Sequence, residues 1–227
     1  MRKIIMSENK NKIALVTGAS RGLGAALAIE LSLKGYHIIA LARTIGGLEA
    51  LDDKINAGKR TATLMPLDIT NEQAIKQCCI SIFERWGRLD LWAHTAIYAP
   101  PLSPINHVDE KEFDKTIAIN IKATSNLIIN LSPLLKLSKS SLAVFFDDAT
   151  FEKKYHGLYG MSKRSQIFLA KTWASENTNS NTNVVIETPS AMATSTRAKF
   201  YPGENKNALS TTKDEAKKIL NRVSKVM

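Results

Sequence analysis

Short apolar runs alternate with helix-length segments along nearly the whole chain, and this rhythm constrains the fold more than any other feature. The runs are KIALVT (12–17), YHIIALA (36–42), TATLMPL (61–67), LDLWAHT (89–95), SLAVFF (141–146) and NVVIET (183–188). Each is nearly continuous in apolar residues, which is typical of a strand in a parallel sheet covered on both faces. The alternation predicts an α/β fold with one Rossmann-type, doubly wound parallel sheet and right-handed crossovers.

The segments between the runs have the length and the end signals of helices. Three of them end before a glycine that we expect to cap the helix in the left-handed conformation: residues 22–34 before Gly35, 46–57 before Gly58 and 71–86 before Gly87. A terminal helix is predicted from Thr212, which stands three residues before Glu215 at capping-box spacing. With 227 residues the chain has room for one full core, so we expect one domain over residues 11–227 and a flexible tail over 1–10.

Composition and charge argue against several classes of protein. The two cysteines, Cys78 and Cys79, are neighbours and cannot form a disulfide framework, which favours the reducing cytoplasm. No apolar run approaches the roughly 18 residues that span a bilayer, and the N-terminal segment lacks a secretory signal, so we expect neither membrane insertion nor export. The net charge is +10, but no basic stripe is interleaved with aromatics, so we expect no nucleic-acid partner. Nucleic-acid binding through that charge stays open as a third hypothesis.

A glycine-rich turn follows the first predicted strand. The sequence TGASRGLG (17–24) places Gly18, Gly22 and Gly24 between that strand and a helix. Glycines here permit a tight turn and let backbone N–H groups approach a pyrophosphate at the helix N-terminus. A glycine triplet alone is a weak signal, but its position at the first strand-to-helix turn predicts dinucleotide binding.

The end of the second strand indicates which dinucleotide is bound. A free ribose 2′-hydroxyl is usually bound by an Asp or Glu near this end, and none occurs between residues 36 and 48. Arg43 stands there instead, and Arg21 lies in the first turn. Because guanidinium groups are forked donors suited to a 2′-phosphate, the sequence favours NADP(H) over NAD(H). The alternative is that Arg43 only faces solvent.

Tyr159 and Lys163 are four residues apart, just after the fifth predicted strand. Residues at this spacing face the same way on a helix, and this helix begins beside the switch point of the sheet, where ligands bind. We expect the Lys163 ammonium to lower the pKa of the Tyr159 phenol, because it stabilises the phenolate. Tyr159 could then exchange a proton with a substrate oxygen while a nicotinamide exchanges hydride with the carbon.

TGASRGLG and the later YGMSK (159–163) resemble the motifs of the short-chain dehydrogenase/reductase family, and the resemblance runs from about residue 12 to residue 197. It implies an oxidoreductase that acts on a carbonyl or a secondary alcohol. The catalytic residues that it implies are Tyr159, Lys163, Asn120 and Asp148. The cofactor-binding residues expected from the motifs and the resemblance are Gly18, Ser20, Arg21, Gly22, Leu23, Gly24, Arg43, Asp68, Ile69, Ala96, Tyr159, Lys163, Pro189 and Thr194. We expect no metal site.

Two of these residues also allow a structural role. Asp68 in LDIT (67–70) matches the family's adenine-contacting acid, or it serves as a turn residue after the third strand. Asn120 in INIKA (119–123) falls within the core-facing stripe of its helix, so its amide must find hydrogen-bond partners. Those partners belong either to a structural network or to the proton relay that the resemblance implies.

Several positions depart from the family pattern. Asp148 stands where the family has a hydroxyl donor, and an ionised carboxylate only accepts hydrogen bonds. Either Asp148 stays protonated through burial, or Thr150 donates instead, or the substrate differs; otherwise turnover is weak. The family's Asn-Asn-Ala-Gly reads HTAI (94–97) here, so Ile97 is expected to crowd the cofactor unless the backbone shifts. We interpret His94 as a strand-stabilising residue.

The C-terminal part of the chain also departs from the family. Ser190 replaces the Gly of the Pro-Gly segment, and the usual seventh strand is missing beyond Thr212, so we expect six strands in the order 3-2-1-4-5-6. Since the missing tail often supports tetramers in the family, we expect a homodimer through helices at 108–136 and 157–176. The leading hypothesis is an NADP(H)-dependent oxidoreductase with a small-molecule substrate. The alternative is a nucleotide-binding or sensor protein without chemistry.

Overall fold

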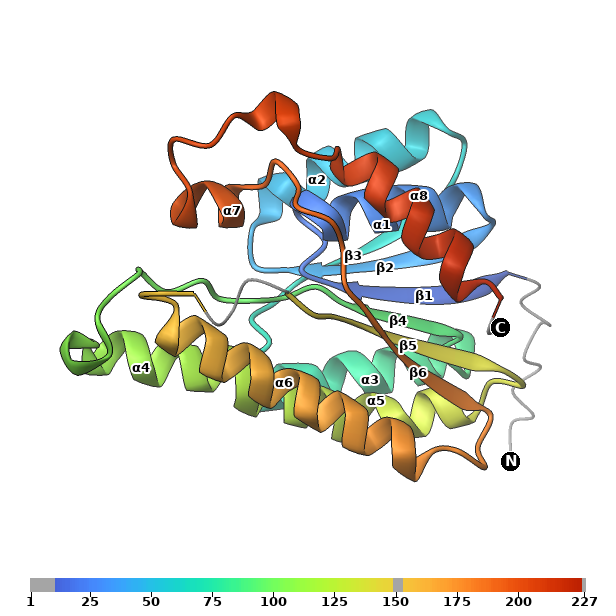
Figure 1. Cartoon of the computed structure of the whole chain (residues 1–227). Coiled ribbons are helices and arrows are strands. Elements are labelled where there is room, and N and C mark those ends of the chain that lie inside the picture. The colour runs from blue at the N-terminus through green and yellow to red at the C-terminus, as the bar shows by residue number, and fades with distance from the viewer. Residues whose placement is uncertain (1–10, 149–152, 226–227) are drawn as a thin grey trace, which may run out of the picture.

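A computed structural model describes residues 11–148 and 153–225 of the chain (Figure 1). The sheet has six parallel strands in the order β3-β2-β1-β4-β5-β6. They are β1 (Lys12–Thr17), β2 (Tyr36–Ala42), β3 (Ala62–Pro66), β4 (Leu91–His94), β5 (Ser141–Phe146) and β6 (Thr182–Glu187). The predicted fold class and strand order are confirmed. The predicted flexible tail, residues 1–10, lies outside the described residues.

Helices cover both faces of the sheet (Figure 1). One face carries α1 (Gly22–Leu33), α2 (Ile45–Ala57) and α8 (Thr212–Val223), and the other carries α3 (Glu72–Trp86), α4 (Glu110–Thr116), α5 (Ala123–Lys136) and α6 (Gly157–Glu176). The short helix α7 (Ser195–Phe200) follows β6. Alternate residues of a strand point to opposite faces. Ile13 and Leu15 therefore join one apolar core, while Ala14 and Val16 join the other.

The predicted glycine caps are confirmed at two positions out of three. Gly35 (φ +88°) and Gly87 (φ +74°) take the left-handed conformation, and the Gly87 amide donates to the Phe83 carbonyl at 2.8 Å. The prediction for Gly58 is wrong, because its φ is −84°. Lys59 takes the left-handed conformation instead, with φ 56°, so the turn after α2 closes one residue beyond the glycine.

The cap of the C-terminal helix also lies one residue away from its predicted position. The Thr211 hydroxyl, not that of Thr212, accepts a hydrogen bond from the Asp214 amide at 3.1 Å and donates to the Asp214 carboxylate at 2.7 Å. After β6, the chain up to residue 225 adds no strand to the sheet and forms only a single bridge between Met192 and Ser210. This agrees with the expected absence of a seventh strand.

A π-helical turn, Ile117–Lys122, joins α4 to α5. Such turns interrupt the regular helical hydrogen bonding and are frequent at functional sites. This turn carries Asn120, which is fully buried, as the core-facing stripe predicted.

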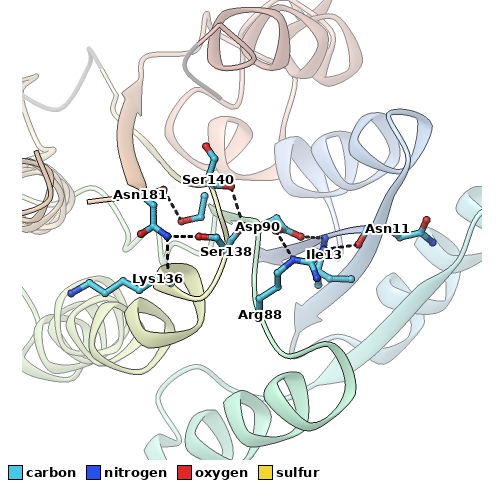
Figure 2. A network of polar contacts seen from close by, with 9 residues as sticks. Asn11, Ile13, Arg88, Asp90, Lys136, Ser138, Ser140 and Asn181 are labelled. Atoms are coloured by element: carbon cyan, nitrogen blue, oxygen red, sulfur yellow. Dashed lines mark hydrogen bonds and ion pairs between the residues drawn. The ribbon is translucent and has the colours of Figure 1, made fainter. Parts of the chain in front are cut away.

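A polar network braces the amino ends of the strands. The Asp90 carboxylate, just before β4, accepts hydrogen bonds from the Ile13 backbone N–H at 2.7 Å and from Arg88 Nε at 2.9 Å (Figure 2). It also accepts from the Ser138 hydroxyl at 2.5 Å, and the Asn181 amide donates to the Ser138 carbonyl. The network ties β1, β4 and β5 at one end of the sheet. The opposite, carboxyl end is where ligands bind in open α/β sheets.

Candidate active site

A cleft of about 490 Å³ opens at the carboxyl ends of the strands. The turn after β1, the ends of β2, β4 and β5, the start of α6 and the segment around α7 line it. It brings together nearly all the residues predicted from the sequence: Gly18, Ser20, Arg21, Gly22, Leu23, Gly24, Arg43, Asp68, Ile69, Ala96, Asp148, Tyr159, Lys163, Pro189 and Thr194. Asn120 does not line the cleft.

The glycines of the glycine-rich turn stand where the chain has no room for a side chain. Gly18 has φ +84°, and a Cβ there would lie 2.7 Å from the Ala96 backbone nitrogen. A Cβ at Gly24 would overlap the Gly18 carbonyl oxygen, while at Gly22 (φ +59°) it would meet the Thr194 methyl group at 3.7 Å. The turn is therefore packed closely against the chain beyond β4. The N-terminus of α1 lies at the cleft, as predicted for a pyrophosphate site.

Arg43 and Asp68 meet at the end of the cleft formed by β2 and β3. Arg43 Nη1 lies 3.4 Å from Asp68 Oδ2, and the two side chains are 57% and 39% exposed. Asp68 also accepts hydrogen bonds from the Thr70 amide at 2.9 Å and the Thr70 hydroxyl at 2.8 Å. Burial opposes ionisation of Asp68, but the Thr70 hydrogen bonds and the Arg43 charge outweigh it and lower the pKa of the carboxyl. Arg21, exposed just before α1, lines the same cleft.

The Tyr159 hydroxyl donates a hydrogen bond to Asp148 Oδ2 at 3.0 Å, and the Tyr159 side chain is buried. Burial raises the pKa of the Tyr159 phenol, and the Asp148 carboxylate raises this pKa further because a phenolate would face a second anion. The expected lowering of the Tyr159 pKa by Lys163 is therefore wrong for this state of the protein. The phenol keeps its proton at neutral pH. Thr150, the alternative donor, lies outside the described residues.

Lys163 is buried beside the same cleft and turns toward its own helix. Its ammonium donates a hydrogen bond to Gln166 Oε1 at 2.8 Å. Burial lowers the pKa of Lys163 to about 8, although the Asp148 and Asp147 carboxylates act in the opposite direction. A positive charge is thus held in a buried place where it is costly unless a polar group accepts its hydrogen bonds.

The Asn120 amide is engaged with the chain beyond β4 and with α6. Its Oδ1 accepts from the Tyr98 amide at 2.7 Å, and its Nδ2 donates to the Tyr98 carbonyl at 2.9 Å and to the Ser162 hydroxyl at 3.0 Å. Ser162 in turn donates to the Tyr159 carbonyl at 2.9 Å. These bonds match the structural network that the sequence allowed, and the relay role stays a prediction.

Gln166 was not singled out by sequence reasoning, and His94 was interpreted only as a strand residue. His94 Nδ1 lies 2.8 Å from Thr17 Oγ1, which ties β4 to β1, and His94 Nε2 lies 3.2 Å from Gln166 Nε2. Burial and the Lys163 charge lower the pKa of His94 to about 3, so its imidazole is neutral. One signal in the sequence could have identified both residues. His94 and Gln166 are polar residues at positions that the strand and helix patterns place in the core.

The segment around α7 lines the end of the cleft that holds Tyr159 and Lys163, which we call the reaction end. The Phe200 ring lies 4.8 Å from the Tyr159 ring, centroid to centroid, and Ile97 packs against the cluster that these two rings form with Ala99. Arg197 makes two hydrogen bonds of 2.5 Å to the Glu204 carboxylate. Ile97 lines the cleft as well, so the predicted crowding of a cofactor by this side chain stays a prediction.

Two classes of feature are absent from the part of the chain that the structure describes. Over residues 11–148 and 153–225, no group of three or more His, Cys, Asp or Glu side chains is placed to hold a metal ion. Over the same ranges, no helix combines the length and the apolar character needed to cross a membrane.

A family model for the short chain dehydrogenases matches residues 12–205. The chain belongs to the short-chain dehydrogenase/reductase family. An uncharacterised oxidoreductase of Listeria innocua is 31% identical to this short-chain dehydrogenase/reductase over 178 residues, which cover 77% of this chain and 71% of that protein.

Solved structures agree with the assignment. A structure assigned as a short chain dehydrogenase from Pseudomonas syringae has a TM-score of 0.86 and 30% identity, and the match covers 89% of this chain and 85% of that one. A second, from Escherichia coli CFT073 and complexed with NADPH, has a TM-score of 0.84 and 27% identity and covers 89% and 86%. The family predicted from two short motifs is therefore confirmed, and with it an oxidoreductase fold that binds a nicotinamide cofactor.

Proposed function

We propose that this short-chain dehydrogenase/reductase transfers hydride between NADP(H) and a small carbonyl compound or secondary alcohol. The observation that carries the proposal is that Tyr159 and Lys163 line the same cleft as the glycine-rich turn Gly18–Gly24. When bound, the nicotinamide supplies or accepts the hydride. The side chains of this chain bind and orient the two reactants and move the proton.

The glycine-rich turn fits a dinucleotide, because it presents the helix N-terminus to the cleft. Only glycine permits this turn, since a Cβ at Gly18 would clash with the Ala96 backbone and one at Gly24 with the Gly18 carbonyl. Around it we assign Ser20, Gly22 and Leu23 to the pyrophosphate, Arg21 and Arg43 to the 2′-phosphate, Asp68 and Ile69 to the adenine, Lys163 to the ribose, and Ala96, Pro189 and Thr194 to the nicotinamide end. Two guanidinium groups at the cleft and a relative solved with NADPH favour NADP(H) over NAD(H).

Tyr159 is the proposed acid. The phenol carries its proton at neutral pH and can donate it to a carbonyl oxygen, but its raised pKa makes it a weaker acid. Before transfer, the Tyr159 O–H must turn from Asp148 to the substrate oxygen. Asp148 therefore orients the phenol and also competes for its proton. The Lys163 ammonium would stabilise the phenolate left behind, and Asn120 would hold the start of α6 through Ser162.

The proposal is tested by following NADPH oxidation with a panel of small aldehydes and ketones. We expect the parent protein to oxidise NADPH with at least one of them, and Tyr159→Phe to lose the rate by roughly 10²-fold or more, as expected for loss of a general acid. The variant should bind NADPH with unchanged heat in titration calorimetry. Turnover by Tyr159→Phe at the parent rate would remove the proposed acid.

A second candidate function is cofactor binding without chemistry, as in a sensor. It is favoured by one observation, the engagement of the Tyr159 proton by Asp148. It predicts that NADPH raises the melting temperature while no carbonyl in the panel is reduced. Any saturable, Tyr159-dependent reduction would exclude it.

We also propose a homodimer that forms through α5 and α6. Ile129 on α5 is 67% exposed and Phe168 on α6 is 71% exposed, and Phe168 lines a groove of about 420 Å³ together with Ile121 and Leu169. Large apolar side chains at such exposure are typical of an interface when they gather on one surface. Sedimentation should show a dimer for the parent and a monomer for Phe168→Glu; a monomeric parent would overturn the assignment.

A further inference from the structure

A chain of buried hydrogen bonds runs from Lys163 into the sheet beneath the cleft. Lys163 Nζ donates to Gln166 Oε1 at 2.8 Å, Gln166 Nε2 lies 3.2 Å from His94 Nε2, and His94 Nδ1 lies 2.8 Å from Thr17 Oγ1. Gln166 Nε2 also donates to Thr124 Oγ1 at 3.1 Å. All five side chains are at least nine-tenths buried. The chain links α6, β4, α5 and β1, and it starts at a residue of the reaction end.

The first member of this chain fixes the orientation of the Gln166 amide. An ammonium only donates, so the Gln166 oxygen must face Lys163 and the Gln166 nitrogen must face the other way. That nitrogen lies 3.2 Å from His94 Nε2, and a hydrogen bond between the two requires Nε2 to accept. His94 Nε2 also lies 3.0 Å from Thr124 Oγ1, whose hydroxyl donates to the Asn120 carbonyl at 2.8 Å. A neutral imidazole with an accepting Nε2 carries its proton on Nδ1, and this N–H donates to Thr17 Oγ1.

The bonds end inside the sheet. Thr17 Oγ1 accepts from Trp92 Nε1 at 3.3 Å and donates to the Ala93 carbonyl at 3.4 Å. Thr17, Trp92 and Ala93 are all buried. A hydrogen-bond chain that ends at a buried carbonyl has no outlet for a proton, so it serves to hold a side chain in place.

We propose that Gln166 is a positioning residue that holds the Lys163 ammonium at the reaction end of the cleft, and that His94, as the Nδ1–H tautomer, sets the direction of the Gln166 amide. The catalytic consequence rests on the proposed function, whereas the tautomer does not. With His94 in the opposite tautomer, Nε2–H would face the Gln166 N–H group. The amide would then turn over and present donors to Lys163.

A neutral acceptor is suited to this task because it satisfies the ammonium without cancelling its charge. The ionisable groups that act on Lys163 are Asp147 and Asp148 from the end of β5, and His94 from β4 is affected by its charge. Tyr159, also on α6, lines the same cleft. A carboxylate at position 166 would add an anion to this group and raise the pKa of Lys163, because opposite charges within a few ångströms favour the charged form. An apolar side chain there would lower it, because the buried ammonium would lose its acceptor.

The tautomer is tested first, by long-range proton–nitrogen NMR of the histidine rings in the full-length, cofactor-free protein at pH 7. The chain has four histidines, and the signals of His94 are assigned by their loss in His94→Asn. We expect His94 to show a protonated Nδ1 and a bare Nε2. In Gln166→Glu, which offers His94 no N–H group, we expect the proton to move to Nε2. An Nε2–H tautomer in the parent, or no change in Gln166→Glu, would overturn the proposal.

The positioning role is tested by the pH profile of kcat for Gln166→Glu and Gln166→Met. We expect the basic limb to move up by about one pH unit or more in the first variant and down in the second, with kcat falling more than KM rises. Gln77→Glu, the same change at an exposed position of α3, should match the parent in the NMR spectrum and the pH profile. Parent-like profiles in both Gln166 variants would overturn the role. A parent without any turnover would count against the proposed function alone, since the NMR result still decides the tautomer.

Discussion

The phosphate end of the cleft and its reaction end are held by different kinds of bond. Around Gly18–Gly24 the shape of the turn depends on close backbone packing that leaves no room for a Cβ at Gly18 or Gly24. At the reaction end, Tyr159 and Lys163 are buried and bonded to other side chains. A backbone surface depends on local chain geometry, whereas a buried polar network depends on distant partners and on their protonation. Ligand binding at the first end should therefore vary little with pH, and chemistry at the second should vary strongly.

The motif residues that depart from the family pattern fall at the second end. His94, Ile97, Asp148 and Ser190 line the reaction part of the cleft, while the glycine-rich turn keeps its motif. Cofactor binding and the proton chemistry can therefore change separately in this fold. The four predictions below test that separation.

The largest effect is expected for Gly24→Ala. The added Cβ would overlap the Gly18 carbonyl oxygen, so the turn must shift and NADPH affinity should fall by about 100-fold. Titration calorimetry measures the affinity. Gly46→Ala is the matched control, because nothing lies within 4 Å of a Cβ there. Equal affinity in the two variants would mean that the turn does not bind the cofactor.

Asp148→Ser should change the reaction end alone. Removing the carboxylate lowers the pKa of the Tyr159 phenol and frees its proton, so NADPH-dependent carbonyl reduction should rise by about 10-fold or more. NADPH affinity should stay within twofold of the parent. The phenol is followed by ultraviolet difference titration against Tyr159→Phe. An unchanged Tyr159 pKa would show that Asp148 does not control it.

The protonation of His94 should make the folded protein acid-sensitive. Its pKa is about 3 in the fold and near 6.5 when unfolded, so below pH 6.5 the unfolded chain binds a proton that the folded chain does not. The free energy of unfolding should therefore fall as the pH drops, by about 2 kcal/mol between pH 6.5 and 5. Urea unfolding at each pH measures this. His94→Asn should lose this component, and equal pH slopes in the two proteins would contradict it.

The smallest effect concerns the nucleotide's 2′-phosphate. Arg43→Ala should weaken NADPH binding by about 10-fold and leave NADH binding unchanged, because a charge-assisted contact to a 2′-phosphate is lost. Arg60→Ala, at an exposed position outside the cleft, is the control. If Arg43→Ala weakened both nucleotides equally, Arg43 would not discriminate between them.

Periodicity and motifs in the sequence predicted the parallel sheet and the glycine-rich turn, and the resemblance to the family supplied the strand order and many of the residues around the cleft. Strand and helix periodicity are local properties, and residues at the ends of parallel strands must meet at one edge of the sheet. The glycine-rich turn and the four-residue spacing of Tyr159 and Lys163 were visible for the same reason. Even local signals had limits. The left-handed residue after α2 is Lys59 and not Gly58, and the capping hydroxyl of α8 belongs to Thr211 and not to Thr212.

Only the tertiary structure decided how the reaction end is bonded. The sequence placed Lys163 near Tyr159 but did not show that Asp148 accepts the phenol proton or that Gln166 accepts the ammonium. The contact between Gln166 and His94 joins residues 72 positions apart. The pKa or the tautomer of a buried group depends on the groups that lie within a few ångströms of it and on its exclusion from water. Both the neighbours and the burial are determined only when the chain folds.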